Sequence, residues 1–524
     1  MKREFKDLIR YEPYEYLNSE ITGGFDEAHA VKCVNGTFVG TEEHGVASWL
    51  GIPYAKPPVG ERRFKAPEYV DASDRVFEAR YYGKGAFGSL GYPDCIQKLV
   101  SEDCLYLNIW VNADDKTEKK PVMVWIHGGA YVVGSGSQVS YSGANLVQAH
   151  SDIIMVNINY RLNMYGFMNF SSVPGGENFK TAPCNGLLDQ AMALRWVHEN
   201  IAAFGGDPDN VTIFGHSAGS TSVTLLPLMK DAQKYFKRVI AQSGTPSLTR
   251  SAEQAITCTD EVMKVLGCKT VADLQKVDVD KIVDATQVLA LHIWAERDGR
   301  NLPLDPYDAY ARGAAKDIDF MQGCTKDEWG YFIYCMGDAG PAFEAERYAN
   351  KLAQMTDEER ASAESYCKRL PATPEYSAIA RFIDQFVFIA PLFRMSEAQT
   401  AAGGKSYTYF FRVESAIPLI RSGHAVELNT VFNHPELKDA AGRAFDETFS
   451  RTMRRMWVKF AKTGNPSLTA KESPDGKAKV WPLYDTKNKE VMVFDEFNIH
   501  TEKESDLKIV EWNLLNILTN YYCI

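Results

Sequence analysis

The chain has 524 residues, of which 45% are hydrophobic and 24% charged, and its formal net charge is −11. These values are ordinary for a globular protein and exclude a disordered or fibrous chain. Because the chain is acidic and has no basic run, we expect neither nucleic acid nor a membrane as a partner.

Aliphatic and β-branched runs alternate with helical patterns and predict an α/β fold. The predicted strands lie at residues 122–126, 153–158, 211–214, 238–242, 318–321 and 407–412. Between the second and third of them, residues 186–204 carry apolar side chains at helical spacing, which predicts an amphipathic helix. Continuous apolar strands separated by helices indicate a mostly parallel central sheet with helices on both faces.

Three further segments complete the expected organisation. Residues 340–400 are helical, charge-rich and free of strand patterns, so we predict a helical insertion or lid over the sheet within a single domain of residues 1–524. Residues 467–479 are polar and contain Pro and Gly, which predicts a surface loop. The apolar tail at 509–524 is interrupted by polar residues and predicts a docking helix, because it is too short and polar to span a bilayer.

The first 20 residues are charged and lack the apolar core of a signal peptide, so we expect a cytoplasmic protein. The ten cysteines form no zinc-binding spacing, and reduced thiols are the simplest expectation. Cys95 with Cys104, and Cys258 with Cys268, lie close enough in sequence to cross-link in an oxidising compartment.

A candidate nucleophile lies in the motif Gly215-His216-Ser217-Ala218-Gly219. The motif follows an apolar run and precedes a helical pattern that extends to Met229, which is the strand–turn–helix context of a G-x-S-x-G elbow. Such a turn strains the backbone of the serine, and glycines at both ends avoid clashes of Cβ atoms. We therefore expect the Ser217 hydroxyl at the positive end of the following helix.

A second loop, at residues 127–131, supports a role in acyl transfer. It follows the strand at 122–126 and carries two adjacent glycines, which let backbone N–H groups point into a cavity. A tetrahedral oxyanion needs two or three such donors. We assign them to the N–H groups of Gly129, Ala130 and Ala218.

These motifs, with others along the chain, resemble the type-B carboxylesterases, the family related to cholinesterases and bacterial para-nitrobenzyl esterases. The matching segments span the chain from about residue 30 to about 490 and lie at residues 51–60, 102–108, 127–131, 159–161, 185–190, 204–208, 215–219, 242–244, 326–328, 460–464 and 481–482. The resemblance implies an α/β-hydrolase fold and ester hydrolysis by a Ser–His–Glu triad without a metal or other cofactor. Because some relatives are adhesion proteins without the triad, each of the three triad residues has to be identified in this sequence.

The resemblance places the triad acid at Glu328, in the segment Gly323-Cys-Thr-Lys-Asp-Glu328. Its rivals are Asp327, which is expected to point the other way, and Asp298, which lies in a predicted turn. This assignment agrees with the chain order Ser, acid, His that is typical of proteins with a G-x-S-x-G nucleophile elbow.

The same resemblance places the base at His424, in the segment Gly423-His424-Ala-Val-Glu427 after the strand at 407–412. His434 is the runner-up, whereas His292 precedes the acid and His500 lies in the tail. We expect Glu427 to support the histidine loop, the segment between the strand at 407–412 and Leu428 that carries His424. His216 stands where most relatives carry Glu, and we expect it to change the electrostatics of the site without being the base.

The sequence thus predicts a serine carboxylesterase that acts on a small-molecule ester as a monomer or homodimer. Trp125, Tyr131 and Trp329 neighbour the motifs and are candidate substrate-binding residues, although the same aromatics also suit the core. The alternatives are a non-catalytic binding module on the same fold, or a lipase or amidase that uses the same machinery.

Overall fold

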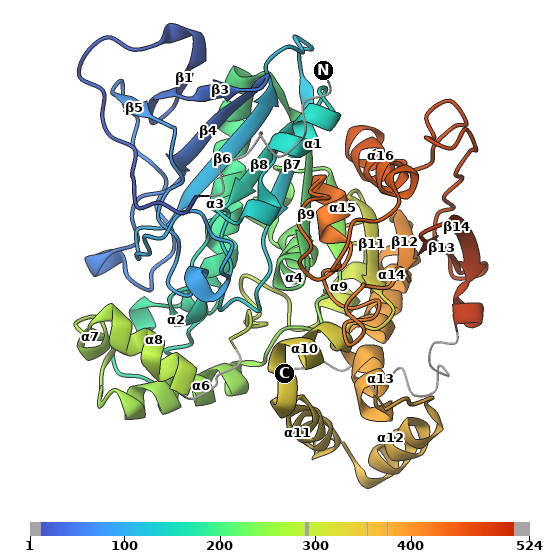
Figure 1. Cartoon of the computed structure of the whole chain (residues 1–524). Helices are drawn as coiled ribbons and strands as arrows, with labels where there is room; N and C mark the ends of the chain where they lie inside the picture. Colours follow the sequence, from blue (N-terminus) through green and yellow to red (C-terminus); the bar gives the residue numbers. More distant parts are fainter. Residues whose placement is uncertain (1–11, 289–292, 354, 375, 508–524) are drawn as a thin grey trace. The chain divides into compact units, whose positions relative to one another are not determined.

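The computed structural model of the chain, shown in Figure 1, describes residues 12–288, 293–353, 355–374 and 376–507. The chain divides into two compact units. One comprises the chain up to Arg238 together with Thr249–Asp305, and the other comprises Val239–Leu248 together with the chain from Pro306 onward. The single domain therefore stays a prediction, and each unit is described by itself.

The first unit contains a mixed sheet whose strand order is β9-β7-β8-β6-β4-β3. Strands β7 and β8, and β7 and β9, pair in parallel, whereas β6 with β8, β4 with β6 and β3 with β4 are antiparallel. The bounds of these strands are β3 (Thr41–Glu43), β4 (Val46–Pro53), β6 (Tyr106–Asn112), β7 (Lys120–Ile126), β8 (Ile154–Ile158) and β9 (Gly206–His216). A smaller sheet has the order β1-β2-β5, with bounds Ala30–Cys33, Gly36–Val39 and Val76–Glu78.

The interior strands of this sheet are buried along their length, which explains their apolar composition. All five residues of β8 are buried, as are Val211 and the five residues that follow it in β9. A strand with both faces covered reads as a continuous apolar run. Figure 1 shows α3 behind strands β4, β6 and β8. The helices of this unit are α1 (Ala144–Ala149), α2 (Asn163–Gly166), α3 (Asn185–Asn200), α4 (Ala218–Leu225), α5 (Lys230–Gln233), α6 (Ala252–Val265), α7 (Val271–Leu274) and α8 (Val279–Val288).

The second unit contains strands in the order β14-β13-β12-β11-β10. Strands β11 and β12, and β12 and β13, pair in parallel, and β13 with β14 forms an antiparallel hairpin. The bounds are β10 (Arg238–Gln242), β11 (Asp319–Thr325), β12 (Ser406–Phe411), β13 (Glu490–Asp495) and β14 (Asn498–Lys503). The carboxyl ends of β11 and β12 lead into the two loops that carry Glu328 and His424.

Helices make up most of the rest of the second unit. They are α9 (Pro306–Ala311), α10 (Trp329–Met336), α11 (Gly340–Ala353), α12 (Asp357–Arg369), α13 (Ala378–Asp384), α14 (Ala390–Ala401), α15 (Leu428–Phe432) and α16 (Glu447–Thr463). A π-helical segment, Gln385–Ile389, joins α13 to α14. Helix α12 begins where a capping box forms, because the Thr356 side chain accepts from the Glu359 backbone and the Glu359 side chain accepts from the Thr356 backbone.

The structure confirms the predicted elements with small shifts of their ends. All six predicted strands are present, although β11 begins one residue later than expected and extends to Thr325, and β12 ends at Phe411. The predicted helix at 186–204 is α3 followed by a 3₁₀ turn, Ile201–Phe204. Most of the described residues in 340–400 are helical, although 370–374 and 376–377, between α12 and α13, are not. Residues 467–479 form a loop with one isolated bridge, between Leu468 and Lys479. The predicted tail helix at 509–524 lies outside the described residues.

The fold is therefore α/β with a mixed, largely parallel sheet. Strands β1 to β6, which pair antiparallel except for the parallel pair β2 with β5, were not predicted, and neither were β13 and β14. Within the part of the chain that the structure describes, no helix has the length and apolar character needed to cross a membrane.

Candidate active site

The turn between β9 and α4 is the predicted elbow. Strand β9 ends at His216, helix α4 begins at Ala218, and Ser217 between them has φ 59° and ψ −124°. A Cβ at Gly219 would lie 2.0 Å from the Ile126 carbonyl oxygen, and one at Gly215 would lie 2.6 Å from the Gly219 backbone. Both distances are shorter than any van der Waals contact. The structure thus confirms the strained serine and the steric need for both glycines.

The loop after β7 approaches this elbow closely. A Cβ at Gly128 would lie 2.6 Å from the His216 carbonyl oxygen and 3.0 Å from the Ser217 Cβ. The next three residues, Gly129, Ala130 and Tyr131, all have positive φ, of 107°, 54° and 60°. A run of such conformations turns successive N–H groups in one direction.

The three backbone amides predicted to bind the oxyanion have no hydrogen-bond acceptor in the part of the chain that the structure describes. The N–H groups of Gly129, Ala130 and Ala218 donate to none of the described backbone carbonyls or side chains. Backbone N–H groups without a partner are rare unless water or a ligand satisfies them. Their place around the elbow supports the predicted oxyanion hole, which stays a prediction.

The second unit holds an acid–base pair. The Nδ1 atom of His424 lies 2.5 Å from Oε2 of Glu328, whose other oxygen, Oε1, accepts from the backbone N–H of Thr325 at 2.7 Å. Glu328 is completely buried and His424 is 3% exposed. A proton on Nδ1 that is donated to the carboxylate leaves the Nε2 lone pair as the basic site of the ring.

Burial dominates the ionisation of both partners. It raises the pKa of Glu328 to about 7, against the lowering effect of the Ser243 hydroxyl and of Thr325. It lowers the pKa of His424 to about 3. Both shifts disfavour the charged form of the group, so the imidazole is neutral and able to accept a proton.

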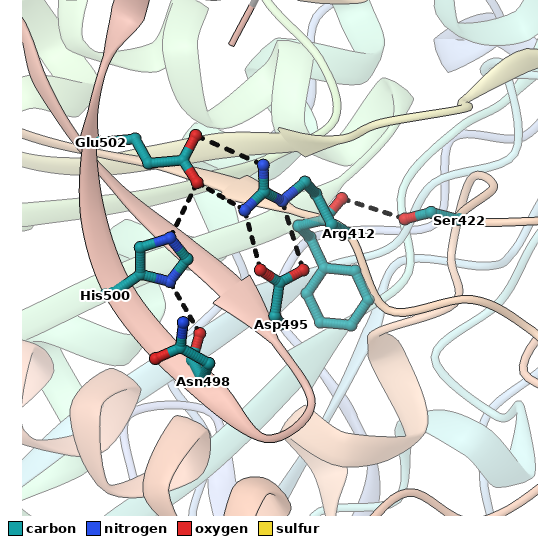
Figure 2. Close-up of polar contacts among 7 residues, drawn as sticks. Arg412, Ser422, Asp495, Asn498, His500 and Glu502 are labelled. Atoms are coloured by element: carbon teal, nitrogen blue, oxygen red, sulfur yellow. Dashed lines mark hydrogen bonds and ion pairs between the residues drawn. The ribbon is translucent and has the colours of Figure 1, made fainter. Parts of the chain in front are cut away.

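The histidine loop is attached to the end of β12. The Ser422 hydroxyl donates to the Phe411 carbonyl oxygen at 3.0 Å, as Figure 2 shows. On the next residue of the chain, the guanidinium of Arg412 lies between Asp495 and Glu502 of the β13–β14 hairpin, at 2.8 and 2.6 Å. The end of β12 is therefore held on one side by the hairpin while it holds the loop that carries His424.

Three aromatic rings surround His424 within the same unit. The ring centroids of Phe332, Phe388 and Tyr331 lie 5.1, 5.3 and 6.2 Å from that of the imidazole. Such rings exclude water from a base and leave an apolar surface for a substrate.

The rival residues have other partners. Asp327 pairs with Arg381 and Arg421, at 3.2 and 3.5 Å. Asp298 accepts from the backbone N–H groups of residues 300–302, which confirms the predicted turn. The Nδ1 atom of His434 lies 2.9 Å from Glu436, and the Nε2 atom of His500 lies 2.7 Å from Glu502 in the network of Figure 2. His292 lies outside the described residues. His216 is buried at the end of β9, whereas its neighbour Ser217 is partly exposed.

The three candidate substrate-binding aromatics are all buried. Trp125, in β7, packs against Tyr141 and Phe214, and Trp329 stacks on Phe343. Tyr131 shares a hydrogen bond of 2.9 Å with the Ser222 hydroxyl, and its ring contacts that of Phe167. Their role in substrate binding stays a prediction.

Sequence reasoning missed two contributors to the pair. Ser243 follows β10 in a left-handed conformation, with φ 57°, and its hydroxyl lowers the pKa of Glu328. It stands in the segment at residues 242–244 that resembles the carboxylesterases, so a signal was present. Phe388 contacts His424 from the π-helical segment, and a helical pattern alone does not reveal which ring faces a base. Glu427 is buried and accepts from the Gln242 amide at 3.1 Å, and its support of the histidine loop stays a prediction.

No group of three or more His, Cys, Asp or Glu side chains is placed to hold a metal ion among the described residues. The nine described cysteines, which include both sequence-close pairs, are free thiols.

Comparisons with known proteins identify the family. The sequence model of the carboxylesterase family matches residues 27–510. The chain belongs to this family of ester hydrolases. It is 36% identical to the para-nitrobenzyl esterase of Bacillus subtilis strain 168 over 492 residues, which cover 90% of this chain and 96% of that protein.

More distant relatives and solved structures extend the match. The acetylcholinesterase of Electrophorus electricus is 29% identical over 558 residues, which cover 91% of this chain and 86% of that enzyme. The crystal structure of a carboxylesterase of Geobacillus stearothermophilus superposes with a TM-score of 0.78 at 34% identity, covering 92% of this chain and 99% of that one. A structure of a PNB esterase gives a TM-score of 0.79 at 34% identity, covering 92% and 100%. The fold is thus that of the carboxylesterase α/β-hydrolases.

Proposed function

We propose that this carboxylesterase hydrolyses uncharged carboxylic esters through Ser217, His424 and Glu328, with the N–H groups of Gly129, Ala130 and Ala218 as the oxyanion hole. The observation that carries the proposal is the buried contact of 2.5 Å between His424 and Glu328. Both residues come after Ser217 in the chain, and Ser217 has a strained backbone at a strand-to-helix turn. An imidazole held by a buried carboxylate is the base that a serine needs at neutral pH.

The reaction proceeds in two halves. The Ser217 oxygen attacks the ester carbonyl carbon while His424 Nε2 takes the hydroxyl proton, and Glu328 stabilises the imidazolium. The tetrahedral intermediate then expels the alkoxide, which leaves as the alcohol with the proton from His424. Water, deprotonated by His424, attacks the acyl-enzyme and releases the acid and the serine. The rings of Phe332 and Phe388 beside the imidazole support an apolar substrate.

Covalent labelling tests the nucleophile directly. A fluorophosphonate is expected to react with the native protein, because the activated serine oxygen displaces fluoride and forms a bond to phosphorus. Mass spectrometry of peptides is expected to place the adduct on Ser217, and heat-denatured protein is expected to remain unlabelled. A native protein without an adduct, or with the adduct on another serine, would contradict the proposal and favour a non-catalytic binding module.

The pH dependence of kcat/KM tests the base. As pH falls, the His424–Glu328 pair takes up its first proton near the higher of the two pKa values, about 7. After that step the pair no longer combines a neutral imidazole with a negatively charged carboxylate, which is the state that can act as the base. We therefore expect kcat/KM to be constant above this value and, below it, to fall inversely with proton concentration, by about tenfold for each pH unit. Nitrophenyl acetate hydrolysis, followed where nitrophenol and nitrophenolate absorb equally, measures the profile. A profile that stays flat down to pH 4.5, the ordinary pKa of a glutamic acid, would exclude this pair as the base.

A further inference from the structure

A second buried cluster of charged groups lies directly beside the acid–base pair in the same unit. At its centre is Asp327, whose side chain is completely buried. Its Oδ1 atom lies 3.2 Å from Nη1 of Arg381 and 3.5 Å from Nε of Arg421, and the more exposed Lys326 ammonium is 4.0 Å from Oδ2. A buried carboxylate is stable only when it is paired in this way, so the two arginines are fixed by it.

The two arginines belong to different segments, and one of them precedes the catalytic histidine. Arg421 lies three residues before His424, whereas Asp327 directly precedes Glu328. The backbones of the two loops are also joined, because the Asp327 N–H donates to the Ser422 carbonyl at 2.9 Å and the His424 N–H donates to the Glu328 carbonyl at 3.2 Å. One ion pair and two backbone hydrogen bonds therefore connect the turn after β11, which carries Asp327 and Glu328, to the loop that carries His424.

The residue after Glu328 is held by a second buried carboxylate, that of Asp384. Asp384, the last residue of α13, accepts from the Trp329 N–H at 2.8 Å and from the Tyr376 hydroxyl at 2.8 Å. The guanidinium groups of Arg381 and Arg421 lie over the Tyr376 ring, at 5.0 and 5.5 Å from its centroid. The chain is thus fixed on both sides of Glu328, by Asp327 before it and by Asp384 after it.

We propose that Asp327, through its ion pairs with Arg421 and Arg381, is a positioning residue that holds the Glu328 carboxylate against Nδ1 of His424. The inference rests on the proposed function and adds a residue that does not itself touch the reacting atoms. A contact of 2.5 Å leaves little room for displacement, and a misplacement of about 1 Å in a catalytic group costs on the order of 10²-fold in rate.

The test is the variant Asp327→Asn, measured with nitrophenyl acetate over a range of pH. We expect kcat to fall by about 10- to 10²-fold with KM changed by less than about twofold, because the acid–base pair and not the substrate contacts is disturbed. We also expect the acid limb of the profile to move to lower pH, because a displaced carboxylate stabilises the imidazolium less. The matched control, Asp475→Asn, removes the carboxylate that pairs with Lys479 in the surface loop 467–479 of the same unit and is expected to leave kcat and the acid limb unchanged.

A second pair of variants covers the case in which Asp327→Asn does not fold. Arg421→Gln removes the ion pair on the histidine loop, whereas Arg421→Lys keeps its charge, so the lysine variant is expected to recover part of the kcat lost in the glutamine variant. Unchanged kcat and acid limb in the folded variants would overturn the inference. A loss of kcat with an unmoved acid limb and no recovery by lysine would also overturn it, because those residues would then serve folding alone.

The same measurements separate this inference from the proposed function. Turnover by the wild type that disappears in Ser217→Ala supports the proposed function whatever Asp327→Asn does. A wild type without turnover of any ester overturns both.

Discussion

Replacing Ser217 with alanine is expected to reduce kcat for a short-chain nitrophenyl ester by at least about 10⁴-fold. The alanine keeps the turn and the amides of Gly129, Ala130 and Ala218, and it removes only the oxygen that attacks the carbonyl. Loss of a nucleophile leaves the residual catalysis that comes from binding and the oxyanion hole. Initial rates with purified wild type and variant, at saturating substrate, measure the effect.

The control for this substitution is Ser171→Ala, which removes the hydroxyl of an exposed serine in the same unit. It is expected to retain wild-type activity. Circular dichroism and thermal unfolding of both variants establish that they are folded. Equal rates for the wild type and a folded Ser217→Ala variant would remove the serine from the mechanism.

Replacing Glu328 with glutamine is expected to reduce kcat by about 10⁴-fold. The glutamine amide can donate to Nδ1 of His424, which favours the tautomer with its proton on Nε2 and so abolishes the base. It also removes the negative charge that stabilises the imidazolium. The shape of the side chain is kept, so KM and the unfolding temperature are expected to change little. Steady-state kinetics at pH 8 and differential scanning fluorimetry measure the two outcomes.

Glu427 provides a matched control for Glu328. Both glutamates are completely buried in the second unit, and burial raises the pKa of each to about 7. Glu427, however, accepts from the Gln242 amide, and the carbonyl oxygen of a glutamine can accept the same hydrogen bond. Glu427→Gln is therefore expected to lower kcat by no more than about tenfold, the equivalent of one hydrogen bond. Equal losses in the two variants would show that kcat responds to any buried negative charge and not to the contact with His424.

Strands β7 to β12 were predictable from the sequence because each contains a run of mostly apolar, buried residues. Residues 154–158 and 211–216 are all buried, and only Asn157, Thr212 and His216 interrupt runs that are otherwise apolar or small. Strands β6 and β13 are also largely buried and were nevertheless not predicted. Two further strands that escaped prediction lack such a run. Strand β14 is exposed or half-exposed along its length, so its sequence carries no continuous apolar run. Strand β4 contains the Gly51-Ile-Pro segment, which reads as a turn although it is paired.

The candidate site was predictable to the extent that its chemistry depends on local sequence. The glycines around Ser217 indicate a tight turn in which a side chain would clash with the backbone. Gly128, in the loop after β7, indicates the same close backbone approach. The fixation of Glu328 depends instead on residues far apart in the chain. Asp327 was expected only to point away from His424, and its pairing with Arg381 and Arg421 could not be read from spacing, because charged residues of both signs occur throughout this region.

The close approach of backbone atoms around Ser217 limits how such a protein can diversify. At residues 128, 215 and 219 even one added methyl group would collide with main-chain oxygen or carbon atoms, so substitution of these glycines is sterically excluded. The rings around His424 face no comparable restriction, because apolar side chains of similar volume exchange at modest cost. A lineage built on this architecture therefore alters its choice of substrate through the walls of the site, while the atoms that break the bond stay as they are.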